Sequence, residues 1–334
     1  MPPLLRFTDK GIYCPHGDFY IDPWRGVDKA VITHAHSDHA RWGSKYYLAH
    51  MHSAPILKFR LGQDINVETI DYNQPVYING VKVSLHPAGH IIGSAQVRVE
   101  YEGDVWVVSG DYKTEADGTC PAFEPVQCNT FISESTFGLP VYRWKKQEQI
   151  FNDINTWWAK NAEQKKTSIV LAYSLGKSQR VLENMDKSIG NIYAHTAVFN
   201  VQQAFINAGL PLYPVKQWTP AVPKGEASLI IAPSSALNSP WLNRFEPYVT
   251  GVCSGWMQVR GAQRRQNADA GFALSDHADW DGLLSAVKAT GAQKVFITHG
   301  YQSVFSRYLN EAGIASEEVI TEYGDDEKEE EAAA

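Results

Sequence analysis

The 334-residue sequence contains only four cysteines, and no two of them form a CxxC pair. A chain of this length with so few cysteines does not build a disulfide framework, which indicates a reducing compartment. The longest apolar runs, such as 105–108 and 229–232, are far too short to cross a bilayer. The first residues also lack the basic-then-apolar pattern of a signal peptide. We therefore expect a cytoplasmic protein with no membrane partner.

The sequence also lacks a basic surplus, because 30 Lys and Arg residues stand against 37 Asp and Glu residues, for a formal net charge of -7. Nucleic-acid-binding domains usually carry excess positive charge, so this total by itself argues against such a partner. The charge is unevenly distributed, with a net +7 over residues 143–270 and a net -5 over the tail 325–334. A basic segment that could face a polyanion therefore lies inside an acidic chain.

Changes in the pattern of apolar runs predict the domain organisation. Short apolar, β-rich runs dominate up to about residue 142, and the same pattern of short runs is found again after residue 271. Between them, strand and helix patterns alternate, which predicts βαβ units and a parallel sheet. We expect one domain formed by residues 1–142 and 271–324, a second domain inserted at 143–270, and a disordered acidic tail at 325–334.

Metal-ligand residues are concentrated in residues 33–39 (THAHSDH), at the end of an apolar strand pattern. A strand directs alternate side chains to one face, so we expect His34 and His36 to project together, with Asp38 and His39 following at a turn. Four such groups would be costly to bury without partners. Imidazole and carboxylate together suit Zn, and also Mn or Fe, in an open hydrolytic site.

Three further candidate ligands, His90, Asp111 and His299, follow other predicted strands. Taken singly, each has a more ordinary interpretation, as a hydrogen-bonded histidine at a strand edge or as a turn residue. Together with the first four they supply seven ligands. Seven is the number that a two-metal site with a shared carboxylate uses.

The ordered motifs resemble a known superfamily. The HxHxDH motif, followed by His90 and Gly110-Asp111, resembles the metallo-β-lactamase fold, a four-layer αββα sandwich, and Asp22 matches its preceding acidic motif. Three later segments resemble motifs A, B and C of the β-CASP nucleases, in that order: Glu134 in SESTFG, His277 in SDHAD and His299 in THG.

The strings GDYK, ESTFGLPVYRW and SGWMQVRG are similar to the bacterial DNA-ligase-associated exonuclease family, and the resemblance extends over residues 5–324. It implies an α+β fold in which a metallo-β-lactamase αββα sandwich carries an inserted α/β β-CASP domain at 143–270. It also implies a metal-dependent phosphodiesterase.

The resemblance assigns roles to the motif residues. One divalent ion would be held by His34, His36 and His90, the other by Asp38, His39 and His299, with Asp111 bridging both ions. Zn fits these ligands best, and Mn is the alternative. A hydroxide activated by the two metals would attack the phosphodiester.

The remaining motif residues would transfer a proton to the leaving group and orient the metal-ligating histidines. His277 would donate a proton to the departing 3′ oxygen as general acid. Glu134 would pair with His277 and hold its orientation and its proton. Asp22 would orient a ligating histidine. Without the resemblance, Asp22 would equally suit a turn before Pro23.

Two segments of the basic region are candidates for contact with nucleic acid. Ser174, Gly176 and Lys177 lie between a predicted strand and helix, where main-chain N–H groups could hold a phosphate. The spacing is not that of a Walker A loop, and an ordinary βα turn is the alternative. Arg260 is close to Trp256, and an arginine beside an aromatic ring suits single-stranded nucleic acid, because the ring can stack on bases and the charge can contact phosphates. The alternative interpretation of Arg260 is an ordinary solvated basic surface.

The leading functional hypothesis is a DNA exonuclease that processes ends in DNA repair, alongside an ATP-dependent DNA ligase and a helicase. Its substrate would be single-stranded DNA or DNA with single-stranded ends. The second hypothesis is an RNA-processing β-CASP enzyme. His299 is common to RNA-acting members, whereas the chain lacks the long C-terminal extension of bacterial ribonuclease J.

Two other classes fit the residues less well. A catalytically inactive scaffold that only binds nucleic acid is expected to have lost ligands, whereas all seven are present. A metallo-β-lactamase hydrolase of small molecules is disfavoured by the inserted segment and by motifs A to C.

Overall fold

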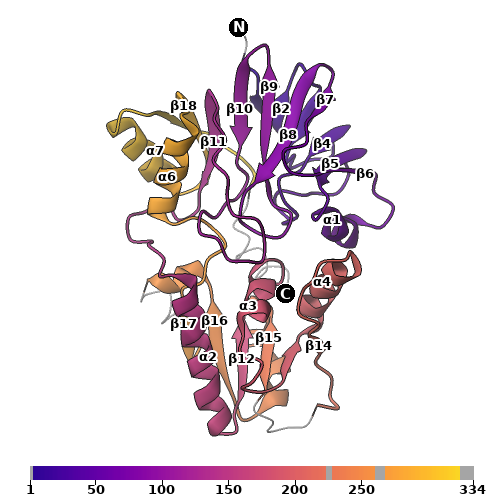
Figure 1. Ribbon diagram of the computed structural model, residues 1–334, viewed down its shortest axis with the longest axis vertical. Coiled ribbons are helices and arrows are strands. Elements are labelled where there is room, and N and C mark those ends of the chain that lie inside the picture. The colour runs from indigo at the N-terminus through magenta and orange to yellow at the C-terminus, as the bar shows by residue number, and fades with distance from the viewer. Residues whose placement is uncertain (1–2, 223–227, 260–267, 324–334) are drawn as a thin grey trace. The chain divides into compact units, whose positions relative to one another are not determined.

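The computed structural model describes residues 3–222, 228–259 and 268–323. They fold into two compact units, shown in Figure 1. The first unit is formed by residues up to Pro140 and from His277 onward, and the second by Val141–Asp276. The predicted acidic tail 325–334 lies outside the described residues. The chain mixes helices with several sheets and is α+β, as the sequence predicts.

The first sheet of the first unit is made of strands from the N-terminal 70 residues. Its strands β1 to β3 are antiparallel, and β3 to β6 are parallel. In spatial order, which is also the chain order, they are β1 (Arg6–Thr8), β2 (Gly11–Cys14), β3 (Phe19–Ile21), β4 (Lys29–Val31), β5 (Tyr46–His50) and β6 (Val67–Ile70).

The second sheet combines the middle of the chain with its C-terminal part. Its strands β7 to β10 pair antiparallel, and β10, β11, β18 and β19 pair parallel. In spatial order they are β19 (Ala315–Glu318), β18 (Lys294–Gly300), β11 (Thr130–Ser135), β10 (Asp104–Val108), β9 (Ala95–Tyr101), β8 (Val81–Pro87) and β7 (Val76–Ile78).

The two sheets pack face to face, and helices cover the other face of the second sheet. Ile132 of β11 joins an apolar cluster shared with the first sheet, while its neighbour Phe131 faces a cluster formed with helices α6 (Trp280–Thr290) and α7 (Gln302–Glu311). This alternation follows the two-residue period of a strand. Figure 1 shows α6 and α7 beside β11 and β18. A shorter helix, α1 (Ala54–Leu61), connects β5 and β6.

The second unit is a parallel sheet with helices. The strand pairs among its described residues are all parallel, as the alternating sequence pattern predicts. The spatial order is β14 (Lys216–Gln217), β13 (Ile192–Ala194), β15 (Leu229–Ala232), β12 (Thr167–Leu171), β16 (Tyr248–Cys253) and β17 (Ala270–Phe272).

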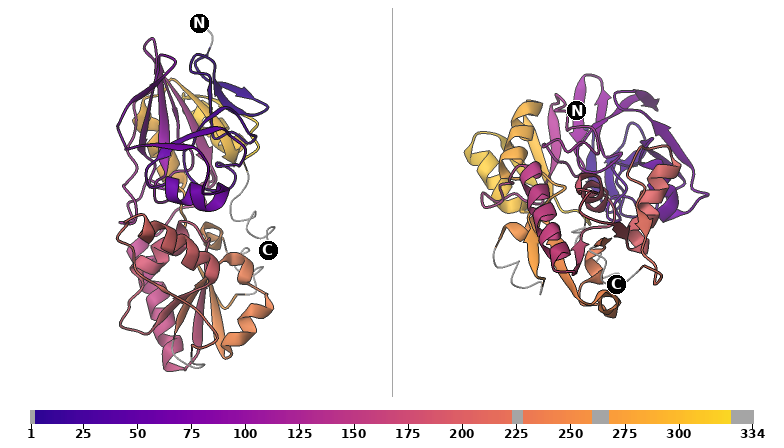
Figure 2. Two further views of the ribbon diagram at one scale, coloured as in Figure 1. Left: turned by 90° about the vertical axis from the view of Figure 1, so that its right-hand side faces the viewer. Right: turned by 60° about the horizontal axis from the view of Figure 1, so that its bottom comes forward.

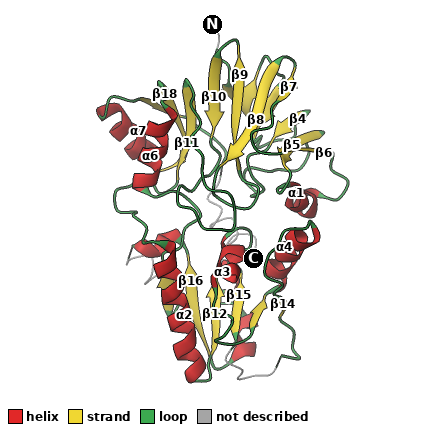
Figure 3. Ribbon diagram, in the orientation of Figure 1, coloured by secondary structure: helices red, strands yellow, loops and turns green. Residues whose placement is uncertain are grey.

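Each face of this sheet has its own apolar cluster. One cluster includes side chains of α2 (Gln147–Glu163), α3 (Lys177–Asn184) and α4 (Thr196–Asn207), which lie in front of the strands in Figures 1 and 3 and are seen from the side in Figure 2. The other contains residues of the 3₁₀ segments Ser234–Ala236, Pro240–Phe245 and Gly255–Gln258. No helix among the described residues is both long and apolar enough to cross a membrane.

Candidate metal centre

The segment after β4 carries four predicted ligands, and all four are buried. β4 ends at Val31, so His34, His36, Asp38 and His39 lie beyond it in an irregular loop. The prediction that strand alternation directs His34 and His36 to one face is therefore wrong, because neither residue has strand conformation. The loop still brings these two rings together, with centroids 4.8 Å apart.

The first group of candidate ligands consists of His34, His36, His90 and one oxygen of Asp111. Nε2 of His34 lies 3.2 Å from Nδ1 of His36, and Nε2 of His90 lies 3.1 Å from that same Nδ1. Oδ2 of Asp111 lies 3.6 Å from Nε2 of His34 and 3.8 Å from Nε2 of His90. His90 follows β8 and Asp111 follows β10, so three separate segments meet here.

The second group consists of His39, His299 and the other oxygen of Asp111. Oδ1 of Asp111 lies 3.0 Å from Nε2 of His299 and 3.5 Å from Nε2 of His39. Oδ2 of Asp38 lies 3.5 Å from the same atom of His39. Asp111 thus presents Oδ2 to the first group and Oδ1 to the second.

The spacing of these atoms fits divalent metal ions. Around a tetrahedral ion that lies about 2.0–2.1 Å from each nitrogen, the ligand atoms are roughly 3.4 Å from one another. This separation lies in the middle of the distances between ligand atoms given above. Nε2 of His39 and Oδ1 of Asp111 are buried, and although they lie within ion-pair distance of other groups, no residue that the structure describes forms a well-aligned hydrogen bond with them. A buried polar atom without a hydrogen bond costs about 1–3 kcal/mol. Bound cations would remove that cost.

Charges within the centre shift the pKa values of its groups in opposite directions. Burial, together with the imidazoles of His39 and His90, holds the pKa of His34 well below its ordinary value. Burial also opposes charge on His39, but Asp38 and Asp111 outweigh it and raise the pKa of His39 well above its ordinary value. Metal ligands must be deprotonated. A cation held by the second group would therefore compete with a proton for His39.

Asp22 lies behind the second group and is fully buried. Its carboxylate accepts a hydrogen bond from the main-chain N–H of Thr33 at 2.7 Å and another from the Thr33 hydroxyl. Its Oδ2 also lies 2.7 Å from Nδ1 of His39. A hydrogen bond at one ring nitrogen fixes the orientation of the other, so Asp22 directs Nε2 of His39 toward Asp111.

His277 and Glu134 form a pair next to the first group. Nδ1 of His277 lies 2.9 and 3.0 Å from the two oxygens of Glu134, which is fully buried at the end of β11. Glu134 also accepts a hydrogen bond from the main-chain N–H of Tyr112 at 2.8 Å. The His277 ring lies 4.7 Å from that of His90, and its side chain is 14% exposed. Since Nδ1 faces Glu134, Nε2 points to the opposite side of the ring.

The arrangement also permits another role for His277. Ligand atoms of Asp111, Glu134 and His277 lie within 4.8 Å of one another and form a third cluster that could hold a cation. His277 is thus placed both beside a carboxylate that can hold its proton and within reach of a cation.

The predicted phosphate-binding segment lies in the second unit, at the start of α3. Gly176 has φ 100°, and its N–H donates to Oε1 of Gln179 at 2.7 Å, while Ser174 lies two residues earlier. Lys177 is only 2% exposed, and its Nζ lies 3.5 Å from Oδ2 of Asp276. Lys177 is therefore buried beside a carboxylate, and Asp276 would compete with a phosphate for its charge. Arg260 lies outside the described residues.

Sequence reasoning missed the rest of this ion group. The Arg180 guanidinium lies 2.8 Å from Oδ1 of Asp276 and is buried. Arg180 belongs to no motif that signals chemistry, and a charged residue in the first turns of a helix ordinarily predicts solvent exposure. Asp276 lies in the SDHAD segment, where the resemblance assigns a role only to the neighbouring His277. Sequence reasoning also missed Tyr323, whose ring stacks on that of His39 with centroids 4.5 Å apart, because a single tyrosine far from the ligand motifs carries no pattern.

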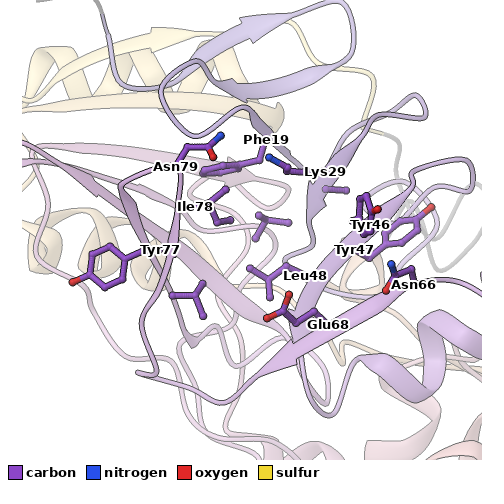
Figure 4. Close-up of a pocket in the computed structure, with 13 residues that line it drawn as sticks. Phe19, Lys29, Tyr46, Tyr47, Leu48, Asn66, Glu68, Tyr77, Ile78 and Asn79 are labelled. Atoms are coloured by element: carbon purple, nitrogen blue, oxygen red, sulfur yellow. The ribbon is translucent and has the colours of Figure 1, made fainter.

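A cavity of about 410 Å³ in the first unit is separate from this centre (Figure 4). It lies among β4, β5, β6 and β7, with Phe19, Leu48 and Ile78 among its apolar lining residues. Tyr46 and Tyr77, 55% and 70% exposed, also line it. None of its lining residues is a predicted ligand.

Comparison with known proteins gives relatives of two kinds. The chain is 29% identical over 316 residues, 94% of its length, to a protein of Opitutus terrae named a probable DNA ligase. It is 29% identical over 209 residues to cleavage and polyadenylation specificity factor subunit 3-I of Arabidopsis thaliana, covering 51% of the chain. It is 28% identical over 125 residues, 36% of its length, to endoribonuclease YSH1 of Saccharomyces cerevisiae.

The chain spans 31%, 29% and 16% of the lengths of these three curated relatives. No protein-family model matches it. A solved structure of a protein of unknown function from Enterococcus faecalis V583 shares the fold, with a TM-score of 0.59 and 11% identity over 89% of this chain and 80% of that one. The relatives confirm the resemblance to the β-CASP branch of the metallo-β-lactamase superfamily.

Proposed function

We propose that this chain, which resembles the β-CASP branch of the metallo-β-lactamase superfamily, is a metal-dependent nuclease that hydrolyses phosphodiester bonds. The observation that carries this proposal is the sharing of Asp111 between two buried groups of imidazoles. A small-molecule hydrolase could use such a centre too. The names of the relatives favour a nucleic-acid substrate, since one is named an endoribonuclease and another a probable DNA ligase.

The proposed architecture follows the same resemblance. The two facing sheets of the first unit, with α6 and α7 on the outside, would correspond to most of an αββα sandwich. The parallel sheet of the second unit would be the inserted β-CASP domain, proposed from the sequence at 143–270, between the domain's parts at 1–142 and 271–324.

The proposed substrate is DNA with single-stranded ends, which the enzyme would trim as an exonuclease beside a DNA ligase in the bacterial cytoplasm. The preference for DNA over RNA is supported by the share of the chain that each relative matches. The relative named a probable DNA ligase matches 94% of the chain, whereas endoribonuclease YSH1 matches 36%. RNA processing is the second candidate, because the shorter match is to a protein named for cleaving RNA.

The proposed cofactor is a pair of divalent cations, Zn by ligand chemistry and Mn as the alternative. Bound cations would supply Lewis acidity, which polarises a phosphodiester and acidifies water. His34, His36 and His90 would hold one ion, and Asp38, His39 and His299 the other. Asp111 would contribute one oxygen to each.

The residues outside the ligand groups would orient and move protons. Asp22 would hold Nδ1 of His39, as its 2.7 Å distance allows. Glu134 would hold Nδ1 of His277 and so direct the proton on Nε2 toward the departing 3′ oxygen. The partial exposure of His277 would allow a substrate to reach it. Ser174, Gly176, Lys177 and Arg260 are the proposed phosphate contacts.

A digest of end-labelled single-stranded DNA and RNA of matched sequence tests this proposal. Metal-free protein is loaded with Zn²⁺ or Mn²⁺, and metal content is measured before each assay. We expect cleavage of DNA from one end, faster than cleavage of RNA. The Asp111→Ala variant should lose both ions and all cleavage, while Asp64→Ala, at an exposed site, should match the wild type.

Each result has a distinct meaning. Internal cleavage of RNA in preference to DNA would replace the leading proposal by the RNA-processing one. No cleavage of either strand by protein that holds two ions would contradict nuclease activity. Normal metal content in Asp111→Ala would contradict the shared-carboxylate assignment.

A further inference from the structure

The last described residues return to the metal centre. The main-chain N–H of Val319 donates to the carbonyl oxygen of Ile297 at 2.9 Å, and the hydroxyl of Thr321 donates to the carbonyl oxygen of Thr298 at 2.7 Å. These bonds hold the segment along the end of β18. His299, a candidate ligand, is the next residue of that strand.

The Tyr323 side chain contacts both imidazoles of the second group. Its ring lies parallel to that of His39, with centroids 4.5 Å apart and 6° between the planes. It meets the His299 ring nearly at a right angle, with centroids 5.8 Å apart and 70° between the planes. Its hydroxyl donates to the main-chain oxygen of Asp22 at 3.3 Å. Trp24 packs edge-on against the same ring at 5.5 Å.

These contacts are restricted to one of the two groups. Within the described residues, Tyr323 has no ring contact with His34, His36 or His90 of the first group. The neighbouring residue Glu322 holds the segment in place, because its main-chain oxygen accepts a hydrogen bond from Arg41 at 3.0 Å. The Tyr323 ring is therefore fixed on the second group from outside.

We propose that Tyr323 is a positioning residue for one metal ion, and that its ring holds the imidazoles of His39 and His299 in the orientation that ligation requires. This inference rests on the proposed two-ion centre. Asp22 fixes the Nδ1 edge of His39, but a single hydrogen bond leaves the ring able to tilt about that bond. The parallel Tyr323 ring blocks the tilt on one face. Loss of such outer contacts typically weakens metal binding about 10–100-fold.

Zinc titration of the metal-free protein against a chromophoric chelator tests this role. Tyr323→Ala and Tyr323→Leu should lower the affinity for one of the two ions about 10–100-fold, while the other ion binds as in the wild type. Tyr323→Phe should retain both affinities because it keeps the ring. Tyr77→Ala, at a 70% exposed tyrosine of the first unit, is the matched control and should bind both ions normally.

Three outcomes would overturn the inference. Wild-type binding of both ions by Tyr323→Ala and Tyr323→Leu would remove the positioning role. Equal weakening of both ions would indicate a general loss of structure, which the melting temperatures of the metal-free variants would also reveal. Equal losses in Tyr323→Phe would assign the effect to the hydroxyl. Wild-type protein that binds fewer than two ions would contradict the proposed function instead.

Discussion

Each oxygen of Asp111 faces a different group of imidazoles, which explains why a carboxylate stands at this position. A neutral imidazole offers one ring nitrogen as an acceptor, whereas an ionised carboxylate offers two oxygens. Burial opposes the charge of Asp111, but His39 and His299 hold its pKa well below the ordinary value. The surrounding imidazoles thus favour the ionised form of Asp111, which is the form that binds a cation.

His277 gives the most direct test of how proton transfer and metal binding are divided. The His277→Ala variant should keep both ions and cleave about 10²–10⁴-fold more slowly, because it loses a general acid and no ligand. Metal content by elemental analysis and single-turnover cleavage rates measure the two effects separately. His16→Ala is the matched control, because His16 is exposed and stacks on Tyr101 outside the centre.

Loss of an ion from His277→Ala would give the opposite assignment. His277 would then be a ligand of the third cluster, with Asp111 and Glu134. Glu134→Gln provides a second check, since it removes the charge that faces Nδ1 of His277 but keeps the side-chain volume. It should slow cleavage without changing metal content.

His50 is a buried histidine outside the metal centre, and it should make stability depend on pH. Its ring stacks on Tyr72 with centroids 3.7 Å apart, and its Nε2 lies 3.3 Å from Oδ1 of Asp71. Burial lowers the pKa of His50 to about 4; the nearby His52 also lowers it, against the opposing effect of Asp71. In the native state the imidazole of His50 therefore stays neutral above about pH 4.

The sign of the pH effect follows from this lowered pKa. Below about pH 6.5 the unfolded chain takes up a proton on His50 that the native protein does not. The free energy of unfolding therefore decreases as the pH is lowered from about 6.5 to about 4, and below that pH it no longer changes through His50. The contribution of His50 is up to about 3 kcal/mol. Urea unfolding of metal-free protein at pH 7 and pH 5 should show a smaller loss for His50→Phe than for wild type. Equal losses would contradict the prediction; His16→Phe should keep the full loss.

At the level of secondary structure, the sequence pattern predicted the long elements better than the short ones. The residue pattern of the sequence predicts a helix over 280–290 and a strand over 95–101, and both are confirmed to the residue. Most strands of the first sheet were not predicted. They have three to five residues, and runs such as Arg6–Thr8 are too short to show a period.

The candidate centre was predictable where its residues form motifs, and only there. The ligand types and order of residues 33–39 indicate metal chemistry in any conformation, so the identification did not depend on the wrong strand assignment. Tyr323 approaches His39 only because the end of the chain folds back along β18. No local pattern encodes such a long-range contact.

The turn after β10 positions Asp111 and depends on Gly110. Gly110 has φ 56°, and a Cβ there would lie 2.6 Å from Cβ and Oγ1 of Thr33, the residue that bonds Asp22. Gly110→Ala should therefore cost roughly 1–3 kcal/mol of stability and move the Asp111 carboxylate. We expect weaker binding of both ions in the zinc titration.

Gly118 provides the matched control for this element. Its φ is 78°, but a Cβ there would have no atom within 4 Å. Gly118→Ala should thus show backbone strain alone, with wild-type affinity for both ions. Equal affinities in Gly110→Ala and Gly118→Ala would show that the contact with Thr33 does not position Asp111.

At the level of the whole molecule, the centre joins distant parts of the first unit. Its candidate ligands follow β4 of the first sheet and β8 and β10 of the second, and His299 lies near the end of β18, so a bound ion would link both sheets. The unfolded chain cannot bring these segments together. Ions that bind the native state alone stabilise it in proportion to the logarithm of their concentration.

Removal of metal should therefore lower the melting temperature. An ion at a free concentration of 100 Kd stabilises the native state by about 2.7 kcal/mol, and each kcal/mol corresponds to roughly 2–4 °C for a domain of 150–250 residues. Calorimetry of metal-loaded and chelator-treated protein should show a drop of at least several degrees that added Zn²⁺ reverses. Asp111→Ala should melt at one temperature under both conditions. An unchanged wild-type transition, with metal removal verified by elemental analysis, would mean that the buried ligands do not bind metal tightly enough to link the two sheets.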